Sequence, residues 1–143
     1  RARANAQAAG VGDRVRFEVA DSDAVVGKTF DFVTTFVVIH DAADPQQMIK
    51  DLRASTADDG TYLMVELNLH EELHENMNLF GRVMYPQSTL YCMTCSLSHG
   101  GAGLGAFMGE NRARAMAQAA GFSRFRKVAS DRPPLPALFE LRP

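Results

Sequence analysis

The sequence predicts an α/β fold in which a mostly parallel sheet ends in an antiparallel hairpin. Two nearly continuous apolar runs, Asp31 to Ile39 and Tyr62 to Leu67, are typical of parallel strands that are covered on both faces. A helical pattern separates them and predicts a right-handed crossover. Near the end, Arg124 to Val128 and Leu138 to Leu141 indicate the two strands of the hairpin. A chain of 143 residues, 46% of them hydrophobic, suits one domain over residues 1–143.

The first twenty residues predict a helix and then a strand. The opening segment is rich in alanine, and Gly10 suits the position that follows the last turn of a helix. Val15, Phe17 and Val19 alternate with charged residues, which is the period-two pattern of a strand near a sheet edge. Since the chain opens inside a helical pattern at Arg1, without methionine, we expect the natural protein to begin further upstream.

The crossover helix has a clear start signal. Asp44 is the expected N-cap, Pro45 suits the first turn, and Gln47 stands where a capping box needs it. Residues 58–60, with the sequence Asp-Asp-Gly, predict the turn into the next strand. One face of the predicted helix is apolar and carries Met48, Ile49 and Leu52.

Residues 70–109 are too long for a plain connection and too apolar for a disordered one. We expect one or two helices and a glycine-rich loop there, inserted on the side where an α/β sheet meets its substrate. Glu110 to Ala120 then predicts a long helix, and residues 131–134 join the two hairpin strands.

The net charge of −2 gives no general attraction to nucleic acid or to anionic membranes. No apolar run approaches the roughly 20 residues that span a bilayer. We therefore expect a cytoplasmic protein whose partner is a small molecule.

Several runs occur in an order that is similar to one enzyme family. They are Ala9 to Val15, Val19-Ala20-Asp21, Phe30 to Val33, His40-Asp41, and Asp58 to Leu63. Together they resemble the class I S-adenosylmethionine-dependent methyltransferases, from the family's second strand onward. The resemblance covers essentially the whole chain, and it implies a Rossmann-like sheet, S-adenosylmethionine as cofactor, and methyl transfer to oxygen or nitrogen of a small acceptor.

The resemblance also implies an incomplete domain. The family's glycine-rich loop and its acidic ribose-binding residue would both precede Arg1, so this chain corresponds to the carboxy-terminal portion. We expect the fragment alone to be inactive, and to need either the missing amino-terminal part or another copy of the chain, as in a homo-oligomer, to fill the gap in its sheet.

The cofactor-binding residues that the resemblance implies follow two strands. Ala20, Asp21 and Ser22 would lie at the adenine, where the Asp21 carboxylate accepts a hydrogen bond from the exocyclic amino group. Phe36 and Val37 would add backbone and apolar contact; relatives look as if they carry an aspartate or asparagine in place of Val37, so no polar contact is expected there. The alternative for Asp21 is an ordinary turn aspartate.

His40 is the catalytic candidate, because it follows the same strand and could accept a proton from the methyl acceptor. Alternatively, His40 and Asp41 only shape the turn before Asp44. Four residues are predicted either to line an apolar substrate pocket or to belong to the core: Met77, Phe80, Met84 and Tyr85.

Other constellations point to different functions. His70, Glu71 and His74 fit the H-E-x-x-H pattern of zinc hydrolases, although no third ligand follows closely. Cys92 and Cys95 favour buried, unreactive thiols, so no metal site is predicted. A non-catalytic regulatory or dimerisation module is a further alternative, since relatives resemble fusions of a winged-helix domain to a methyltransferase domain.

Overall fold

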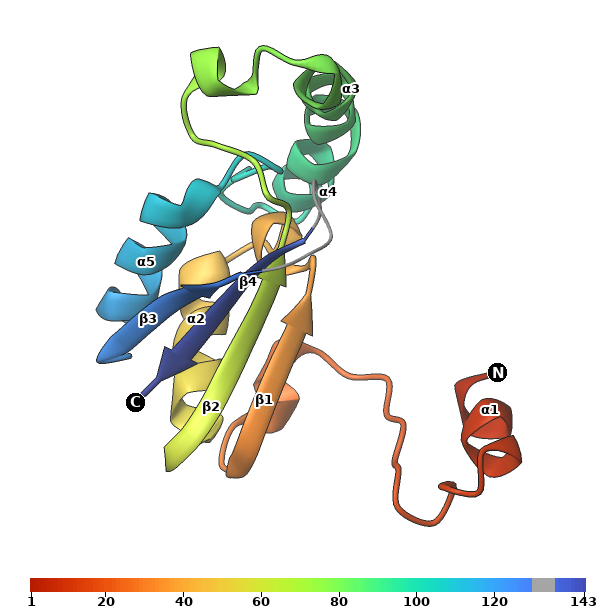
Figure 1. Cartoon of the computed structure of the whole chain (residues 1–143). Coiled ribbons are helices and arrows are strands. Elements are labelled where there is room, and N and C mark those ends of the chain that lie inside the picture. The colour runs from red at the N-terminus through yellow and green to blue at the C-terminus, as the bar shows by residue number, and fades with distance from the viewer. Residues whose placement is uncertain (130–135) are drawn as a thin grey trace.

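The computed structural model describes residues 1–129 and 136–143, and these form one four-stranded sheet in the order β1-β2-β4-β3 (Figure 1). Its strands are β1 (Phe30–Phe36), β2 (Thr56–Glu66), β3 (Arg124–Val128) and β4 (Ala137–Arg142). β1 and β2 are parallel, whereas β4 is antiparallel to both β2 and β3. Three strands therefore point one way and the last strand is reversed, which confirms the predicted sheet and its closing hairpin. The predicted connection 131–134 lies outside the described residues.

The crossover helix α2 (Pro45–Ser55) begins where the sequence predicts. An Asp44 side-chain oxygen accepts a hydrogen bond from the backbone N–H of Gln47 at 2.8 Å, so the N-cap is made. The Gln47 side chain donates to Asp51 instead of completing the capping box. Ile49 and Leu52 are buried, and the helix is thereby fixed against the sheet.

Helix α5 (Gly109–Ala119) packs beside α2, and both cover the same face of the sheet (Figure 1). Ala113 and Ala117 are fully buried in this layer, which explains the alanine-rich sequence of the helix. The main hydrophobic core lies between these helices and the sheet and includes Ile39, Ile49, Leu52, Tyr62, Met64, Ala113, Ala117, Phe122, Phe139 and Leu141.

A helical cap, residues 70–108, lies beyond the carboxyl ends of β1 and β2 (Figure 1). A short 3₁₀ turn (Leu73–Asn76) precedes α3 (Leu79–Gln87), a π turn (Ser88–Cys92) and α4 (Met93–Ser98). These last three run into one another, and the π turn follows Pro86, which cannot donate a backbone hydrogen bond. The helices expected in this segment are therefore present. None of the helices described is long and apolar enough to cross a membrane.

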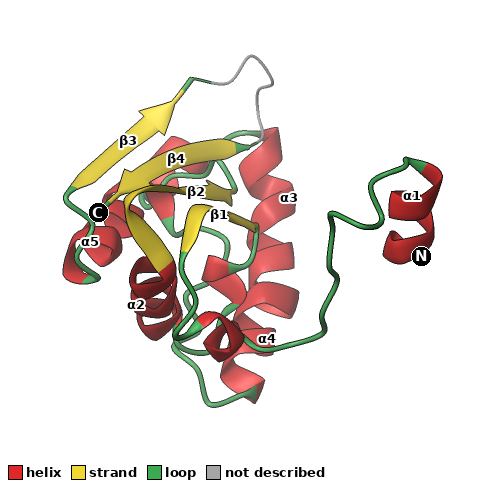
Figure 2. Ribbon diagram, turned by 90° about the horizontal axis from the view of Figure 1, so that it is seen from below, coloured by secondary structure: helices red, strands yellow, loops and turns green. Residues whose placement is uncertain are grey.

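The prediction of an edge strand at Val15, Phe17 and Val19 is wrong. Helix α1 (Ala2–Ala8) forms as expected, but residues 15–20 follow it as an exposed, irregular segment. Figures 1 and 2 show α1 and this segment standing away from the sheet. A strand needs a neighbour for its backbone hydrogen bonds, and no described strand lies within reach. Alternating hydrophobicity alone could not supply that neighbour.

Residues 58–60 also differ from the prediction, because they lie inside β2 and do not end it. The pairing with β1 moves from Phe30 opposite Thr56 to Phe32 opposite Thr61, so the intervening residues of β2 bulge out of register. Turn-forming residues are compatible with such a bulge. β1 in turn ends at Phe36, three residues before the predicted Ile39.

Candidate active site

The chain changes direction sharply where β1 ends. Val37 has a φ of 54°, which is a left-handed conformation that β-branched residues rarely adopt. Its N–H still donates to the carbonyl oxygen of Val65 at 2.8 Å, so the residue is held by the sheet. A 3₁₀ turn (Ile39–Asp41) follows and carries the chain back toward the core. Strained residues of this kind gather at functional sites.

This turn buries His40 and pairs it with an acidic residue from the next strand. His40 is 1% exposed, and its Nδ1 lies 2.6 Å from Oε2 of Glu66, which is 2% exposed. The other Glu66 oxygen accepts a hydrogen bond from the Ile39 N–H at 2.9 Å. Glu66 therefore holds both the turn and the imidazole ring. It ends β2, where parallel strands deliver ligand-binding residues.

A second carboxylate faces the other side of the ring. Oδ1 of Asp41 lies 3.2 Å from Nε2 of His40. Burial works against a charged imidazole, but the hydrogen bond to Glu66 and the negative charges of Glu66 and Asp41 outweigh it and raise the pKa of His40 above its usual 6.5. A raised pKa suits a group that must accept a proton.

Cys92 completes this group from the cap. Donor atoms of His40, Asp41 and Cys92 all lie within 4.8 Å of one another. Burial, helped by the neighbouring Asp41 carboxylate, raises the pKa of the Cys92 thiol to about 12. The thiol is therefore protonated near neutral pH and is not a free nucleophile, as the sequence analysis expected of a buried cysteine.

A groove of about 530 Å³ lies beside the end of β1 and the start of α2. Asp21 and Ala20 line it together with Val38 and Asp41, so the predicted adenine residue lies at the carboxyl edge of the sheet. Asp21 is the N-cap of the short helix Ser22–Val25, yet its side chain makes no capping hydrogen bond and is exposed. We call this hollow the β1–α2 groove; its other lining residues are Ala42, Ala43, Asp44, Gln47, Met48 and Asp51.

The other predicted cofactor residues lie close by. Ser22 directly follows Asp21 in the chain. Phe36 is 64% exposed and Val37 is 38% exposed at the end of β1, but Val38 is the residue there that lines the groove. His40 does not line the groove; it lies behind Asp41. The structure thus brings the cofactor candidates to one edge and leaves the catalytic candidate buried.

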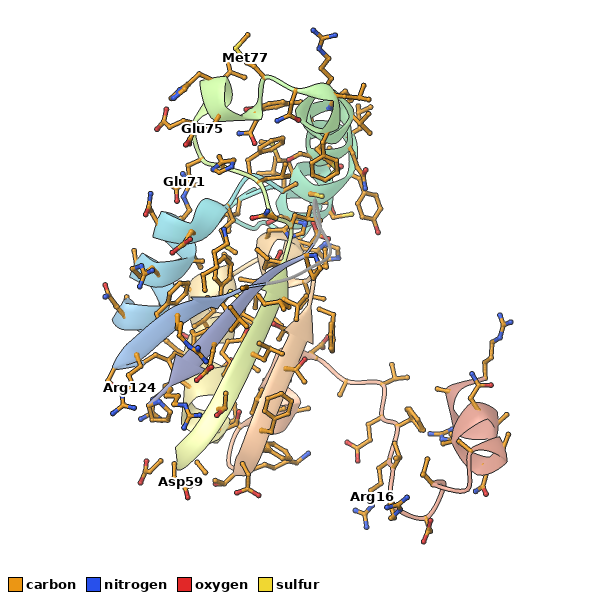
Figure 3. All side chains as sticks on the ribbon, in the orientation of Figure 1. Arg16, Asp59, Glu71, Glu75, Met77 and Arg124 are labelled. Carbon is orange, nitrogen blue, oxygen red and sulfur yellow. The ribbon has the colours of Figure 1, made fainter. Side chains whose placement is uncertain are left out.

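The four substrate candidates are not all together. Met84 is buried in a core cluster of the cap, and Phe80 packs against that cluster. Tyr85 stacks on Phe107, with 4.0 Å between ring centroids. Met77 is 78% exposed at the outer end of the cap (Figure 3). Phe80, Met84 and Tyr85 share the cap interior, which agrees with the core alternative, and their contact with a substrate stays a prediction.

The H-E-x-x-H motif does not have the geometry of a zinc site. Such a site needs both histidines on one face of an α-helix, but residues 70–72 are irregular and His74 lies in a 3₁₀ turn. Oε1 of Glu71 accepts a hydrogen bond from the backbone N–H of Arg112 at 2.6 Å. Glu71 (Figure 3) therefore caps the first turn of α5 and does not face a metal. The metallohydrolase alternative is rejected.

Sequence reasoning missed Glu66. The available signal was an acidic residue that ends the apolar run Tyr62 to Val65, because a charge at the end of a buried strand needs a partner. The partner, His40, is 26 residues away in sequence. Only the parallel pairing of β1 with β2 brings the two together.

Comparison with known proteins gives a match at the level of fold. No family model and no curated protein sequence matches. Among solved structures, a putative O-methyltransferase from Nostoc punctiforme matches 98% of this chain with a TM-score of 0.71 and 15% identity. PigF with SAH matches 99% with a TM-score of 0.69 and 16% identity, and the mitomycin 7-O-methyltransferase MmcR matches 99% with 0.70 and 17%. The chain has the fold of the class I O-methyltransferases.

This chain contains only part of the methyltransferase fold. The chain spans 40%, 39% and 38% of the length of the three structures, respectively. Mixed α/β architecture, a parallel β1–β2 pair and the reversed β4 all fit a carboxy-terminal portion of that fold. The resemblance stated from the sequence is therefore confirmed for the fold.

Proposed function

We propose that this chain is the carboxy-terminal part of an S-adenosylmethionine-dependent methyltransferase that acts on oxygen or nitrogen of a small molecule. The observation that carries the proposal is the buried His40–Glu66 pair at the carboxyl edge of a methyltransferase-fold sheet. Ligands of open α/β sheets bind at this edge. The groove with Asp21 lies at the same edge.

His40 is the proposed base. Glu66 accepts the Nδ1 proton, which leaves the Nε2 lone pair for a proton of the acceptor. As described above, Nε2 faces Asp41 and His40 is 1% exposed, so an acceptor must displace the Asp41 carboxylate from the ring before a proton can move. Asp41 is itself partly exposed in the groove, so this movement requires no change in the sheet.

The β1–α2 groove is the proposed site for the adenosine end of the cofactor. The Asp21 carboxylate, which makes no capping bond, can accept from the exocyclic amino group of adenine, and the backbone N–H of Ser22 or Asp23 can donate to the neighbouring ring nitrogen. When bound, S-adenosylmethionine supplies a methyl group on a positively charged sulfur. Holding the acceptor in line with that methyl group contributes most of the acceleration.

The proposed active form contains a partner for the open edge of β1. β1 pairs on one side with β2 and has no other neighbour among residues 1–129 and 136–143, so one edge is open. Phe30, Phe32 and Phe36 alternate along this strand and therefore share one face of the sheet, where they are 40%, 58% and 64% exposed. An apolar, unpaired strand edge favours pairing with further chain. We propose that residues preceding Arg1 supply this partner together with the glycine-rich loop, and that a second copy of the chain is the alternative.

The test compares one variant of the natural-length protein with the wild type. His40→Gln is expected to retain binding of S-adenosylhomocysteine in calorimetry and to lose methyl transfer by about 100-fold or more, as removal of a general base does. Absence of S-adenosylhomocysteine binding in both the wild type and His40→Gln would contradict the proposal. Wild-type binding without any turnover would favour the second candidate, a non-catalytic regulatory module, which the burial of His40 also fits.

A further inference from the structure

We propose that Cys92 is a positioning residue that holds the Asp41 carboxylate against His40 and thereby couples the cap to the proposed base. The three side chains meet where the cap contacts the turn after β1, and their polar atoms lie within 4.8 Å of one another. His40 and Cys92 are both buried there. The proposal rests on the proposed role of His40 as a base, but the coupling itself can be measured without methyl transfer.

The Asp41 carboxylate is held from two sides. Its Oδ1 atom lies 3.2 Å from Nε2 of His40. The Cys92 thiol, which ends the π turn of the cap, donates a hydrogen bond to the same carboxylate. This thiol keeps its proton near neutral pH, as described above, so it remains a donor. Without the thiol, the carboxylate would be free to turn into the β1–α2 groove, which Asp41 lines.

The backbone that follows Asp41 is also fastened to the cap. The buried Ser96 hydroxyl donates a hydrogen bond to the carbonyl oxygen of Ala42 at 2.9 Å. The backbone N–H of Ala102 donates to the carbonyl oxygen of Ala43 at 3.0 Å. The cap therefore contacts three consecutive residues, of which Asp41 is the first. A shift of the cap acts directly on the carboxylate that faces the base.

This contact controls the protonation of His40. Glu66 from β2, Asp41 from the turn itself and Cys92 from the cap are the titratable groups that face the ring in the described structure. The two carboxylates favour the charged imidazole, which carries a proton on each nitrogen and accepts no other. When Asp41 moves away, the pKa of His40 falls and the Nε2 proton passes to solvent. The lone pair that the methyl acceptor needs is then present.

The experiment measures the pKa of His40 from its imidazole NMR signals in the natural-length protein, assigned by their loss in His40→Gln. Cys92→Ala frees the Asp41 carboxylate, so the pKa of His40 should fall by about 1. Cys92→Ser keeps a donor at this position and should restore most of the wild-type pKa. Cys95→Ala is the matched control, since Cys95 is the other free cysteine and is not part of the cluster, and it should leave the pKa unchanged.

A double-mutant cycle tests whether the effect passes through Asp41. Asp41→Asn should lower the pKa of His40 by itself, and the addition of Cys92→Ala should lower it no further. Far-ultraviolet circular dichroism checks the fold of each variant, and Cys92→Val, which fills the space of the thiol without a donor, should reproduce the fall if Cys92→Ala does not fold. An unchanged or raised pKa of His40 in the folded Cys92 variant, or a fall that persists beside Asp41→Asn, would overturn the proposal.

The pH dependence of methyl transfer separates this proposal from the proposed function. The acidic limb of the kcat/KM profile reports the pKa of the base in the free enzyme. In Cys92→Ala this limb should move to lower pH by the same amount as the pKa of His40 in NMR. Absence of turnover in the wild type would contradict the proposed function, and the NMR result would still decide the coupling.

Discussion

Glu66→Gln is the most informative test of the His40–Glu66 pair. The amide keeps the size of the side chain and one acceptor oxygen, so it can still accept either from Ile39 N–H or from His40, but the negative charge is lost. A hydrogen bond to a charged group contributes about 1.5–3 kcal/mol in proteins. We expect the free energy of unfolding to fall by about 2–3 kcal/mol where His40 is charged.

The loss should depend on pH in one direction. Because the pKa of His40 is raised above 6.5 in the folded state, the extra stability from the charged ring is fully present below 6.5. It disappears as the pH rises through the folded-state pKa. The deficit of Glu66→Gln should therefore be largest near about pH 6 and should shrink to about 1 kcal/mol near pH 9, where one neutral hydrogen bond is exchanged.

Urea unfolding of both proteins at these two pH values measures the effect, and the imidazole shifts in NMR give the pKa of His40 in each. Glu72→Gln is the matched control, because Glu72 is an exposed glutamate outside the pair. An equal deficit at both pH values, or an unchanged pKa of His40 in Glu66→Gln, would refute the reasoning.

Three more substitutions test other parts of the account by urea unfolding. Val37→Asn should stabilise the fold by about 1 kcal/mol, because asparagine tolerates the left-handed backbone at φ 54°; a loss of stability would contradict the assigned strain. Glu71→Ala should lower the free energy of unfolding by about 1 kcal/mol, since it frees the N–H of Arg112 in the first turn of α5. An unchanged free energy of unfolding would contradict the capping role of Glu71. Tyr62→Phe should lower the free energy of unfolding by about 1–2 kcal/mol, because the buried Thr35 hydroxyl, 2.7 Å from the tyrosine oxygen, loses its partner. An unchanged free energy of unfolding would show that Thr35 forms a different hydrogen bond.

The sequence predicted those elements whose signals are local. Asp44 and Pro45 mark the start of α2 within a few residues, and the alanine-rich pattern of α5 is continuous. The signals that start and stop a helix are local, so these positions could be read directly from the sequence. The edge strand at Val15 to Val19 failed for the opposite reason, since a strand depends on a partner that the local pattern does not contain.

The site shows the same division. His40 could be named because it follows a recognisable strand, whereas Asp21 was named through the family resemblance, since the strand predicted before it does not form. The structure nevertheless places Asp21 in the groove beside the end of β1. Glu66 left only the signal of an acidic residue at the end of an apolar run, and its pairing with His40, like the position of Cys92, could not be named because these contacts depend on strand pairing and on the position of the cap. The left-handed Val37 was equally out of reach, since valine gives no signal for that conformation.

The most direct test of the account is calorimetric binding of S-adenosylhomocysteine to the natural-length protein and to Asp21→Ala. Asp23→Ala is the control, because Asp23 is an exposed aspartate in the same short helix, and the substitution removes its carboxylate but keeps its backbone N–H. If Asp21 binds the adenine, Asp21→Ala should bind about tenfold more weakly, equivalent to about 1.4 kcal/mol, and Asp23→Ala should bind as the wild type does. Equal affinity in all three proteins would contradict the placement of adenosine at this edge of the sheet.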